Sequence, residues 1–262
     1  QRTPRGTGMR TGINRQPSAP PYRGIVFDCD STLATIEGIE ELADGASAEV
    51  RARIAHLTDE AMEGRLPLQD AYGARLQVLK PTRAQVDRIG DLYIENALPN
   101  ARELVSALHY LGKHVSVVSG GLRTPVQHLS KHLGIDPSDA QAVDLSFDAN
   151  GDYTGFDKSS PLARSGGKLE VLSRLAERHG PLALIGDGAT DLEAAPVCAR
   201  FIAFAGVEAR PAVMQAADKV CREADLAALL PLLCTDEELT RLANHPDHAA
   251  LVLAAQSFST SS

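Results

Sequence analysis

The chain contains 262 residues, with 26 Lys and Arg against 34 Asp and Glu, which gives a formal net charge of −8. Apolar residues make up 44% and charged residues 23%, a composition typical of globular proteins and not of disordered or collagen-like chains. The acidic balance argues against a nucleic-acid-binding protein held by phosphate contacts, and no apolar run approaches the ~18 residues needed to span a membrane.

The cysteines at 29, 198, 221 and 234 are spread along the chain without a CxxC pair or the spacing of a disulfide framework. Isolated cysteines of this kind are typical of reduced thiols, so we expect a cytoplasmic protein. The first residues are basic but lack the apolar stretch of a secretory signal.

The N-terminal segment differs from the remainder in composition. Residues 1–24 carry five Arg, four Pro and no acidic residue. They hold too few apolar side chains to form a core, so residues 1–21 are predicted to be a disordered basic arm. An organelle-targeting peptide or an arm that binds anions is the alternative reading of this segment.

Short apolar runs at 24–27, 115–118, 182–185 and 201–204 predict buried strands. Segments of helical periodicity lie between them, and this alternation predicts an α/β fold built on a Rossmann-like parallel sheet. The Asn-Gly pair at 150–151 separates two further short runs and predicts a β-hairpin, since this pair favours a type I′ turn.

The helices of the expected core have recognisable ends. Asn100 followed by Glu103 resembles a capping box at the start of a helix over 100–111. A second helix is expected at about 124–133 and a third begins at Lys168, and each of these ends at a glycine.

Residues 37–98 show only helical periodicity and interrupt the alternation, so they are predicted to form an inserted helical cap domain. The α/β core then consists of residues 22–36 and 99–230. Residues 231–262 are expected to add a C-terminal helical extension, with two short helices broken at Pro246.

Several carboxylates follow the predicted strands. Asp28 and Asp30 follow the first, and Asp187 and Asp191 follow the third. Because ligands bind beyond the carboxyl ends of parallel strands, these side chains should converge. Several ionised carboxylates in one crevice need a cation, and an all-oxygen ligand set suits Mg²⁺.

Groups suited to phosphate accompany these carboxylates. Ser119 and Gly120 follow the second strand just before a helix, where a hydroxyl and free backbone N–H groups can bind a phosphate oxygen. Lys168 supplies the positive charge that a dianion requires. Carboxylates, Mg²⁺, an amide cradle and one lysine together indicate phosphoryl transfer.

These motifs resemble a known family. The string Phe27-Asp28-Cys29-Asp30-Ser31-Thr32-Leu33 is similar to motif I of the haloacid dehalogenase (HAD)-type phosphatases, in the DxDST form of the phosphoserine phosphatases. Ser119, Lys168 and the segment Gly186 to Asp191 resemble motifs II, III and IV. The resemblance covers roughly residues 22–226 and implies the HAD fold with its inserted cap.

The resemblance also implies a mechanism. Asp28 would attack phosphorus to form an aspartyl-phosphate, and Asp30 would act as general acid and then as general base. Mg²⁺ would be held by the Asp28 side chain, the main-chain carbonyl of Asp30 and the Asp187 side chain. Lys168 would neutralise charge on the nucleophile and the phosphoryl group, with Asp191 orienting it.

Other positions match the family's substrate site. Ser119 and Gly120 would hold phosphoryl oxygens, and Thr190 and Arg210 would lie beside the substrate. The implied reaction hydrolyses O-phospho-L-serine to L-serine and phosphate, the last step of serine biosynthesis.

Specificity for phosphoserine requires groups for its ammonium and carboxylate. Glu37, nine residues beyond Asp28, matches the family's ammonium-binding Glu. Arg75 matches the carboxylate-binding Arg, whose planar fork suits a carboxylate. Met62 matches a cap residue that closes the pocket. Leu68 departs from relatives that carry Phe, which implies a smaller apolar lid.

Two alternatives stay open at this point. A HAD phosphatase acting on other small phosphomonoesters would use the same core, and a non-enzymatic switch would retain its phospho-Asp. The expected partner is the small-molecule substrate, without nucleic acid or membrane. An apolar helix near residues 249–255 is compatible with a homodimer.

Overall fold

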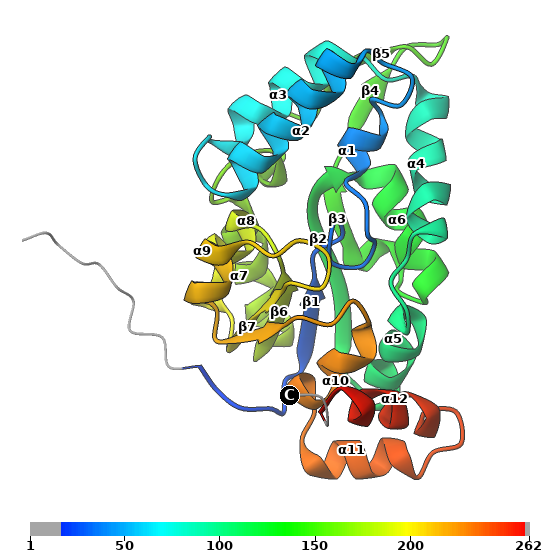
Figure 1. The fold of residues 1–262 in the computed structure, drawn as a ribbon, viewed down its shortest axis with the longest axis vertical. Coiled ribbons are helices and arrows are strands. Elements are labelled where there is room, and N and C mark those ends of the chain that lie inside the picture. The colour runs from blue at the N-terminus through cyan, green and yellow to red at the C-terminus, as the bar shows by residue number, and fades with distance from the viewer. Residues whose placement is uncertain (1–16, 260–262) are drawn as a thin grey trace, which may run out of the picture.

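The computed structural model of the chain describes residues 17–259. A parallel sheet with the strand order β3-β2-β1-β6-β7-β8 forms its centre (Figure 1). The sheet strands are β1 (Gly24–Phe27), β2 (His114–Leu122), β3 (Ala140–Val143), β6 (Leu182–Gly186), β7 (Arg200–Phe204) and β8 (Lys219–Cys221). The remaining strands, β4 (Leu145–Phe147) and β5 (Tyr153–Phe156), pair antiparallel as a hairpin.

The helices cover both faces and both ends of this sheet. They are α1 (Gly38–Glu41), α2 (Ala48–Met62), α3 (Leu68–Leu79), α4 (Arg83–Glu95), α5 (Ala101–Tyr110), α6 (Arg123–Leu133), α7 (Gly167–His179), α8 (Ala189–Ala194), α9 (Pro211–Ala216), α10 (Leu230–Leu233), α11 (Asp236–Ala243) and α12 (Ala249–Ser259). Short 3₁₀ helices span Pro137–Asp139, Pro161–Ala163, Ala195–Val197 and Leu226–Leu229.

The predicted α/β fold is confirmed. Each apolar run that predicted a sheet strand forms one, and β1 is buried along its whole length, as a strand in the middle of a parallel sheet must be. Helices α5 and α6 lie on one face and α7 to α9 on the other (Figure 1), which right-handed crossovers require for this strand order. Strands β3 and β8 were not predicted, because they are short and lie toward the edges of the sheet.

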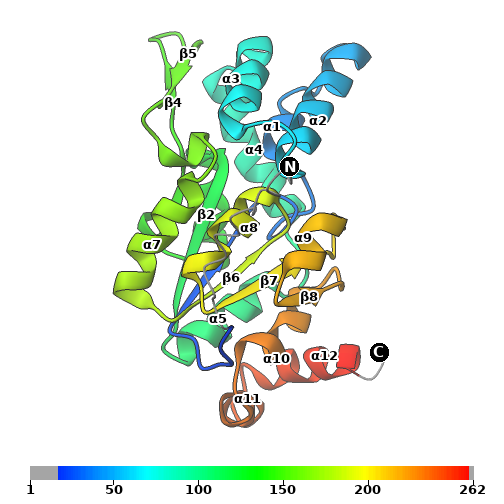
Figure 2. The ribbon, with the colours of Figure 1, turned by 90° about the vertical axis from the view of Figure 1, so that its left-hand side faces the viewer.

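The cap and the extension lie at opposite ends of the sheet (Figures 1 and 2). Helices α1 to α3 and the β4–β5 hairpin lie beyond the carboxyl ends of the strands, whereas α10 to α12 lie at the amino ends. Helix α4, although part of the predicted cap segment, packs against α6 of the core. The domain boundaries at 37 and 98 stay predictions.

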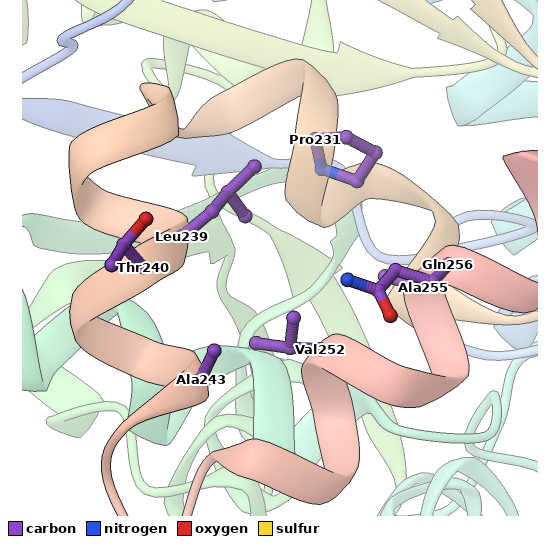
Figure 3. A pocket seen from close by; sticks show the side chains of 7 residues that line it. All are labelled: Pro231, Leu239, Thr240, Ala243, Val252, Ala255 and Gln256. Atoms are coloured by element: carbon purple, nitrogen blue, oxygen red, sulfur yellow. The ribbon is translucent and has the colours of Figure 1, made fainter.

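The C-terminal extension forms the two helices expected on either side of Pro246. Together with Pro231 of α10 they line an open, mostly apolar pocket of about 160 Å³, toward which Leu239 and Val252 project (Figure 3). Leu251 is buried against the core, but Leu253 on the same helix is 66% exposed. None of the helices within residues 17–259 is both long and apolar enough for a transmembrane segment.

The capping box predicted at Asn100 is wrong. Asn100 adopts a left-handed backbone conformation with φ of 60°, and its side chain makes no capping hydrogen bond to the helix. Its amide instead donates to both carboxylate oxygens of Asp225, at 2.9 and 3.0 Å. The Asn100 side chain therefore binds Asp225, far away in the sequence, and does not cap α5, although α5 begins where expected.

The predicted disordered arm lies mostly outside the described residues, but order begins before residue 22. The backbone N–H of Ser18 donates to the carbonyl of Ala199 at 2.9 Å, and the Ser18 carbonyl accepts from Tyr22 and Arg200. Backbone groups thus find partners in the core even where the local sequence is too polar to pack.

Candidate functional site

The site lies where the central strands end. Phe27, the last residue of β1, pairs with Val117 of β2 and with Ile185 of β6. This register places Asp28, directly after β1, beside the end of β6, while β2 continues past it to Leu122. The carboxyl ends of these strands therefore meet at one edge of the sheet, as the sequence predicts.

A buried lysine joins two of the carboxylates. The Lys168 Nζ lies 2.7 Å from Oδ1 of Asp191 and 3.2 Å from Oδ2 of Asp28. Burial alone would lower the pKa of Lys168, but the charges of Asp191 and Asp28 raise it above its ordinary value. Lys168 is therefore a fixed cation beside the predicted nucleophile. Oδ2 of Asp191 accepts from the Gly188 N–H at 3.1 Å, which anchors the pair to the start of α8.

Three buried carboxylates form a cluster that could hold a metal ion. Oxygen atoms of Asp28, Asp187 and Asp191 all lie within 4.8 Å of one another. Burial, followed by the charge of Asp28, raises the pKa of Asp187 to about 7. Thr32 and Arg210 donate to the two oxygens of Asp187, at 3.2 and 3.1 Å. The Arg210 guanidinium and the Thr32 hydroxyl offset only part of the negative charge of the three carboxylates, so the cluster favours a cation.

The Asp30 carboxyl group is not part of this cluster and has other partners. Its Oδ1 accepts from the Gly38 N–H at 2.8 Å and from the Tyr93 hydroxyl at 2.5 Å. Burial raises the pKa of Asp30 to about 6, although these two hydrogen bonds oppose the increase. Cys29, between the two aspartates, is fully buried and belongs to the apolar core.

A narrow, partly open cavity of about 20 Å³ lies between the strand ends and the helices of the predicted cap, with room for a water molecule but not for a phosphomonoester. The residues that line the cavity are Asp28, Asp30, Glu37, Ile39, Met62, Leu68, Arg75, Ser119, Gly120, Gly121 and Thr190.

Arg75 enters this cavity as a buried guanidinium without a carboxylate partner. The side chain is 3% exposed, and its Nη1 donates to the Thr58 hydroxyl at 2.8 Å. Its Nε has no hydrogen-bond partner, and no Asp or Glu within residues 17–259 forms an ion pair with it. A buried cation with unsatisfied donors requires an anion, so this part of the cavity suits a carboxylate or phosphate.

Glu37 lines the same cavity with the opposite charge. Its Oε1 accepts from the Ser31 hydroxyl at 2.6 Å. Burial and then the charge of Asp30 raise the pKa of Glu37 well above its ordinary value. A cationic group in the cavity would restore the ionised carboxylate, because opposite charges at short range favour each other.

Met62, Ser119, Gly120 and Thr190 also occupy the positions that the sequence predicts around this cavity. The Ser119 Oγ accepts from the Gly121 N–H at 2.9 Å, which fixes the hydroxyl at the cavity wall. β2 extends through this Ser-Gly-Gly segment, where the sequence predicts a loop.

Arg210 differs from these residues. It does not line the cavity, and besides Asp187 it contacts Asp59 in cap helix α2, with Nη1 3.5 Å from the carboxylate.

The sequence gives no functional signal for several residues of the site. Tyr93 is fully buried on α4, where an aromatic side chain is typical of a core position. Thr58 lies inside α2, and only its proximity to Arg75 distinguishes it. Thr32 stands inside the DxDST string, so its contact with Asp187 could have been sought there.

Comparisons with known proteins agree with this geometry. The family model for haloacid dehalogenase-like hydrolases matches residues 25–196. The phosphoserine phosphatase of Rattus norvegicus is 41% identical over 184 residues, which cover 70% of this chain and 81% of that protein. The human phosphoserine phosphatase is 40% identical over the same lengths.

Solved structures show the same relationship. A substrate-bound phosphoserine phosphatase complex superposes with a TM-score of 0.69 at 29% identity, covering 80% of this chain and 97% of that one. A phospho-aspartyl intermediate analogue of a phosphoserine phosphatase gives a TM-score of 0.69 at 30% identity, covering 79% and 96%. Sequence and fold are thus similar to the same group of proteins.

Proposed function

This chain belongs to the haloacid dehalogenase-like hydrolases and, within them, to the phosphoserine phosphatase family, and from this we propose an Mg²⁺-dependent hydrolysis of O-phospho-L-serine. The reaction yields L-serine and phosphate through an aspartyl-phosphate on Asp28. It would complete serine biosynthesis in the cytoplasm.

The presence of Arg75 and Glu37 in the lining of one cavity carries the substrate assignment. Phosphoserine has a carboxylate and an ammonium besides its phosphate. The unsatisfied guanidinium of Arg75 suits the carboxylate, and the desolvated carboxyl group of Glu37 suits the ammonium. A substrate without these two charges would leave both groups uncompensated.

The acidic cluster fits a hard divalent cation. Asp28 and Asp187 offer carboxylate oxygens, and Asp30 would add its main-chain carbonyl. Asp191 is the less suitable ligand, since its oxygens already accept from Lys168 and Gly188. When bound by these residues, Mg²⁺ would neutralise part of the negative charge on the nucleophile and the phosphoryl group.

The side chains of this site divide the chemistry between them. An oxygen of Asp28 attacks phosphorus while the P–O bond to serine breaks, and Asp30 donates its proton to the departing serine oxygen. Lys168 neutralises charge on Asp28 and the phosphoryl group, and Ser119 binds a phosphoryl oxygen. Asp30 then takes a proton from the water that attacks phosphorus, which releases phosphate and restores Asp28.

The decisive experiment compares two substrates. Wild-type protein should release phosphate from L-phosphoserine with Mg²⁺, and EDTA or Asp28→Asn should abolish this release. Glu37→Gln and Arg75→Met should lower kcat/KM for L-phosphoserine at least about tenfold more than for p-nitrophenyl phosphate, since charged hydrogen bonds are worth about 1.5–3 kcal/mol. Equal losses on both substrates would leave a phosphatase of other specificity.

A stable phosphoprotein formed without turnover would instead favour the phospho-Asp switch. Multiple turnovers of phosphate release per protein molecule would exclude that switch.

A further inference from the structure

The Asp30 carboxyl group is held by one oxygen only. Both of its donors, the Gly38 N–H and the Tyr93 hydroxyl, bind Oδ1. Oδ2 accepts no hydrogen bond from any residue in the described part of the chain. The two oxygens of the proposed general acid therefore have different surroundings.

The free oxygen lies beside one wall of the cavity. A Cβ atom built on Gly121 would lie 3.0 Å from Oδ2, so this oxygen is next to Gly121, which lines the cavity together with Ser119 and Gly120. A protonated carboxyl group that accepts two hydrogen bonds on Oδ1 carries its proton on Oδ2. The proton is then carried by the oxygen beside Gly121, next to the Ser119 and Gly120 groups that would bind the phosphoryl oxygens.

Tyr93 reaches Asp30 because the structure leaves room for it. The side chain is fully buried on α4, and α4 packs against α6 of the core. A Cβ atom on Gly38 would collide with the Tyr93 hydroxyl. The contact therefore depends on a glycine at position 38 and on a helix whose position the core fixes.

We propose that Tyr93 is a positioning residue for the reaction, which holds Oδ1 of Asp30 so that Oδ2 delivers the proton to the leaving alcohol. This inference rests on the proposed phosphatase chemistry. In the first step the Asp28–phosphorus bond forms, the phosphorus–oxygen bond to the alcohol breaks, and the Oδ2 proton passes to the alcohol oxygen. No further reactant is required.

The nature of the leaving group separates this role from simple core packing. An alkyl alkoxide such as that of serine leaves poorly without a proton, whereas p-nitrophenolate leaves readily. The value of kcat/KM reports the steps up to the first irreversible one, which is the departure of the alcohol. A defect in proton delivery therefore lowers kcat/KM for phosphoserine and spares p-nitrophenyl phosphate.

The experiment measures kcat/KM of wild type and Tyr93→Phe on both substrates with Mg²⁺. Tyr93→Phe keeps the buried ring, and we expect a loss of about tenfold or more on L-phosphoserine but less than about threefold on p-nitrophenyl phosphate, since general acid catalysis contributes about 10²–10⁴. Tyr22→Phe is the matched control, because Tyr22 is 1% exposed and donates to the Ser18 carbonyl at the other end of the strand.

A second variant disturbs the contact between Tyr93 and Asp30 by a change at Gly38. Gly38→Ala displaces the Tyr93 hydroxyl while the tyrosine stays in the chain, and it should reproduce the selective loss. Equal losses on both substrates in Tyr93→Phe, or no loss on either, would overturn the positioning role.

Failure of the proposed substrate gives a different result. If wild type hydrolyses only other phosphomonoesters, the same comparison is made between β-glycerol phosphate and p-nitrophenyl phosphate, and a selective loss still supports the role of Tyr93. Absence of all turnover in wild type would overturn both the phosphatase activity and the role of Tyr93.

Discussion

The Nε of Arg210 lies 3.1 Å from Oδ2 of Asp187, and both side chains are buried at the edge of the sheet. Sequence similarity predicts Arg210 beside the substrate, and the structure adds this contact with a proposed metal ligand. The Arg210 guanidinium partly neutralises the acidic cluster that would bind Mg²⁺. The positive charge of Arg210 should therefore weaken the binding of the ion.

Replacing Arg210 should therefore strengthen Mg²⁺ binding. In Arg210→Met the cluster loses its nearby positive charge, and the half-saturating Mg²⁺ concentration should fall several-fold, while KM for substrate rises. Phosphate release measured against Mg²⁺ concentration gives the first value, and release measured against substrate concentration at saturating Mg²⁺ gives the second. Arg174→Met, on the exposed surface of α7, is the control. An unchanged or higher Mg²⁺ requirement in Arg210→Met would show that the guanidinium does not oppose the metal.

The ion pair between buried Lys113 and half-buried Glu238 should determine how firmly the C-terminal extension is attached. The Lys113 Nζ lies 2.6 Å from Oε1 of Glu238 in α11 and donates to the Tyr22 carbonyl at 3.0 Å. Lys113→Met removes the cation from a half-buried carboxylate, which should lower the free energy of unfolding by about 1.5–3 kcal/mol, the usual worth of a hydrogen bond to a charged group. Urea denaturation measures this loss.

A double variant tests the origin of that loss. Glu238→Gln can keep the capping box with Thr235, because glutamine serves as well as glutamate at this helix position. Lys113→Met combined with Glu238→Gln should therefore be more stable than Lys113→Met alone. Additive losses would mean that the two side chains do not interact energetically.

His114 should make the protein less stable in mild acid. Its ring stacks on His179 with centroids 3.6 Å apart, and burial lowers its pKa, opposed by Asp139. The folded pKa is below the unfolded value, so the unfolded chain binds the proton first as the pH falls. The stabilisation is present above about pH 6.5 and is lost as the pH falls through the folded pKa.

We expect the melting temperature to fall between pH 7 and pH 5, and to fall less in His114→Gln. Scanning calorimetry at a series of pH values measures this. His56→Gln, at an exposed position of α2, serves as the control and should follow wild type. If His114→Gln follows wild type as well, other groups determine the acid sensitivity.

The features that could be predicted from the sequence are those that depend on local motifs, and not those that depend on contacts between distant residues. The motifs at the strand ends and at the start of a helix combine local patterns with chemically distinctive residues, so the sequence predicts that Asp28, Ser119, Lys168 and Asp187 converge, and the structure brings them to one edge of the sheet; their roles stay predictions. Tyr93 could not be found this way, because its role comes from a contact with Asp30, 63 residues earlier in the chain.

The misassigned cap at Asn100 has the same origin. A capping box is a local pattern, but Asp225 competes for the asparagine side chain from 125 residues away. The same holds for the last residues of the N-terminal arm, where Ser18 finds hydrogen-bond partners in β7 that local composition does not reveal. Local propensities predict elements, and long-range hydrogen bonds decide the exceptions.

Metal binding should be detectable without turnover. A cation that binds the native acidic cluster but not the unfolded chain stabilises the fold, by about 2.7 kcal/mol at one hundred times its dissociation constant. For a domain of this size each kcal/mol corresponds to about 2–4 °C. Protein freed of metal with EDTA should therefore melt roughly 5–10 °C higher when saturating Mg²⁺ is added back.

Asp187→Asn should lose most of this shift, because it removes one of the buried carboxylate ligands. Asp148→Asn, in the exposed turn between β4 and β5, should keep it. An equal shift in Asp187→Asn would place the Mg²⁺ elsewhere on the protein.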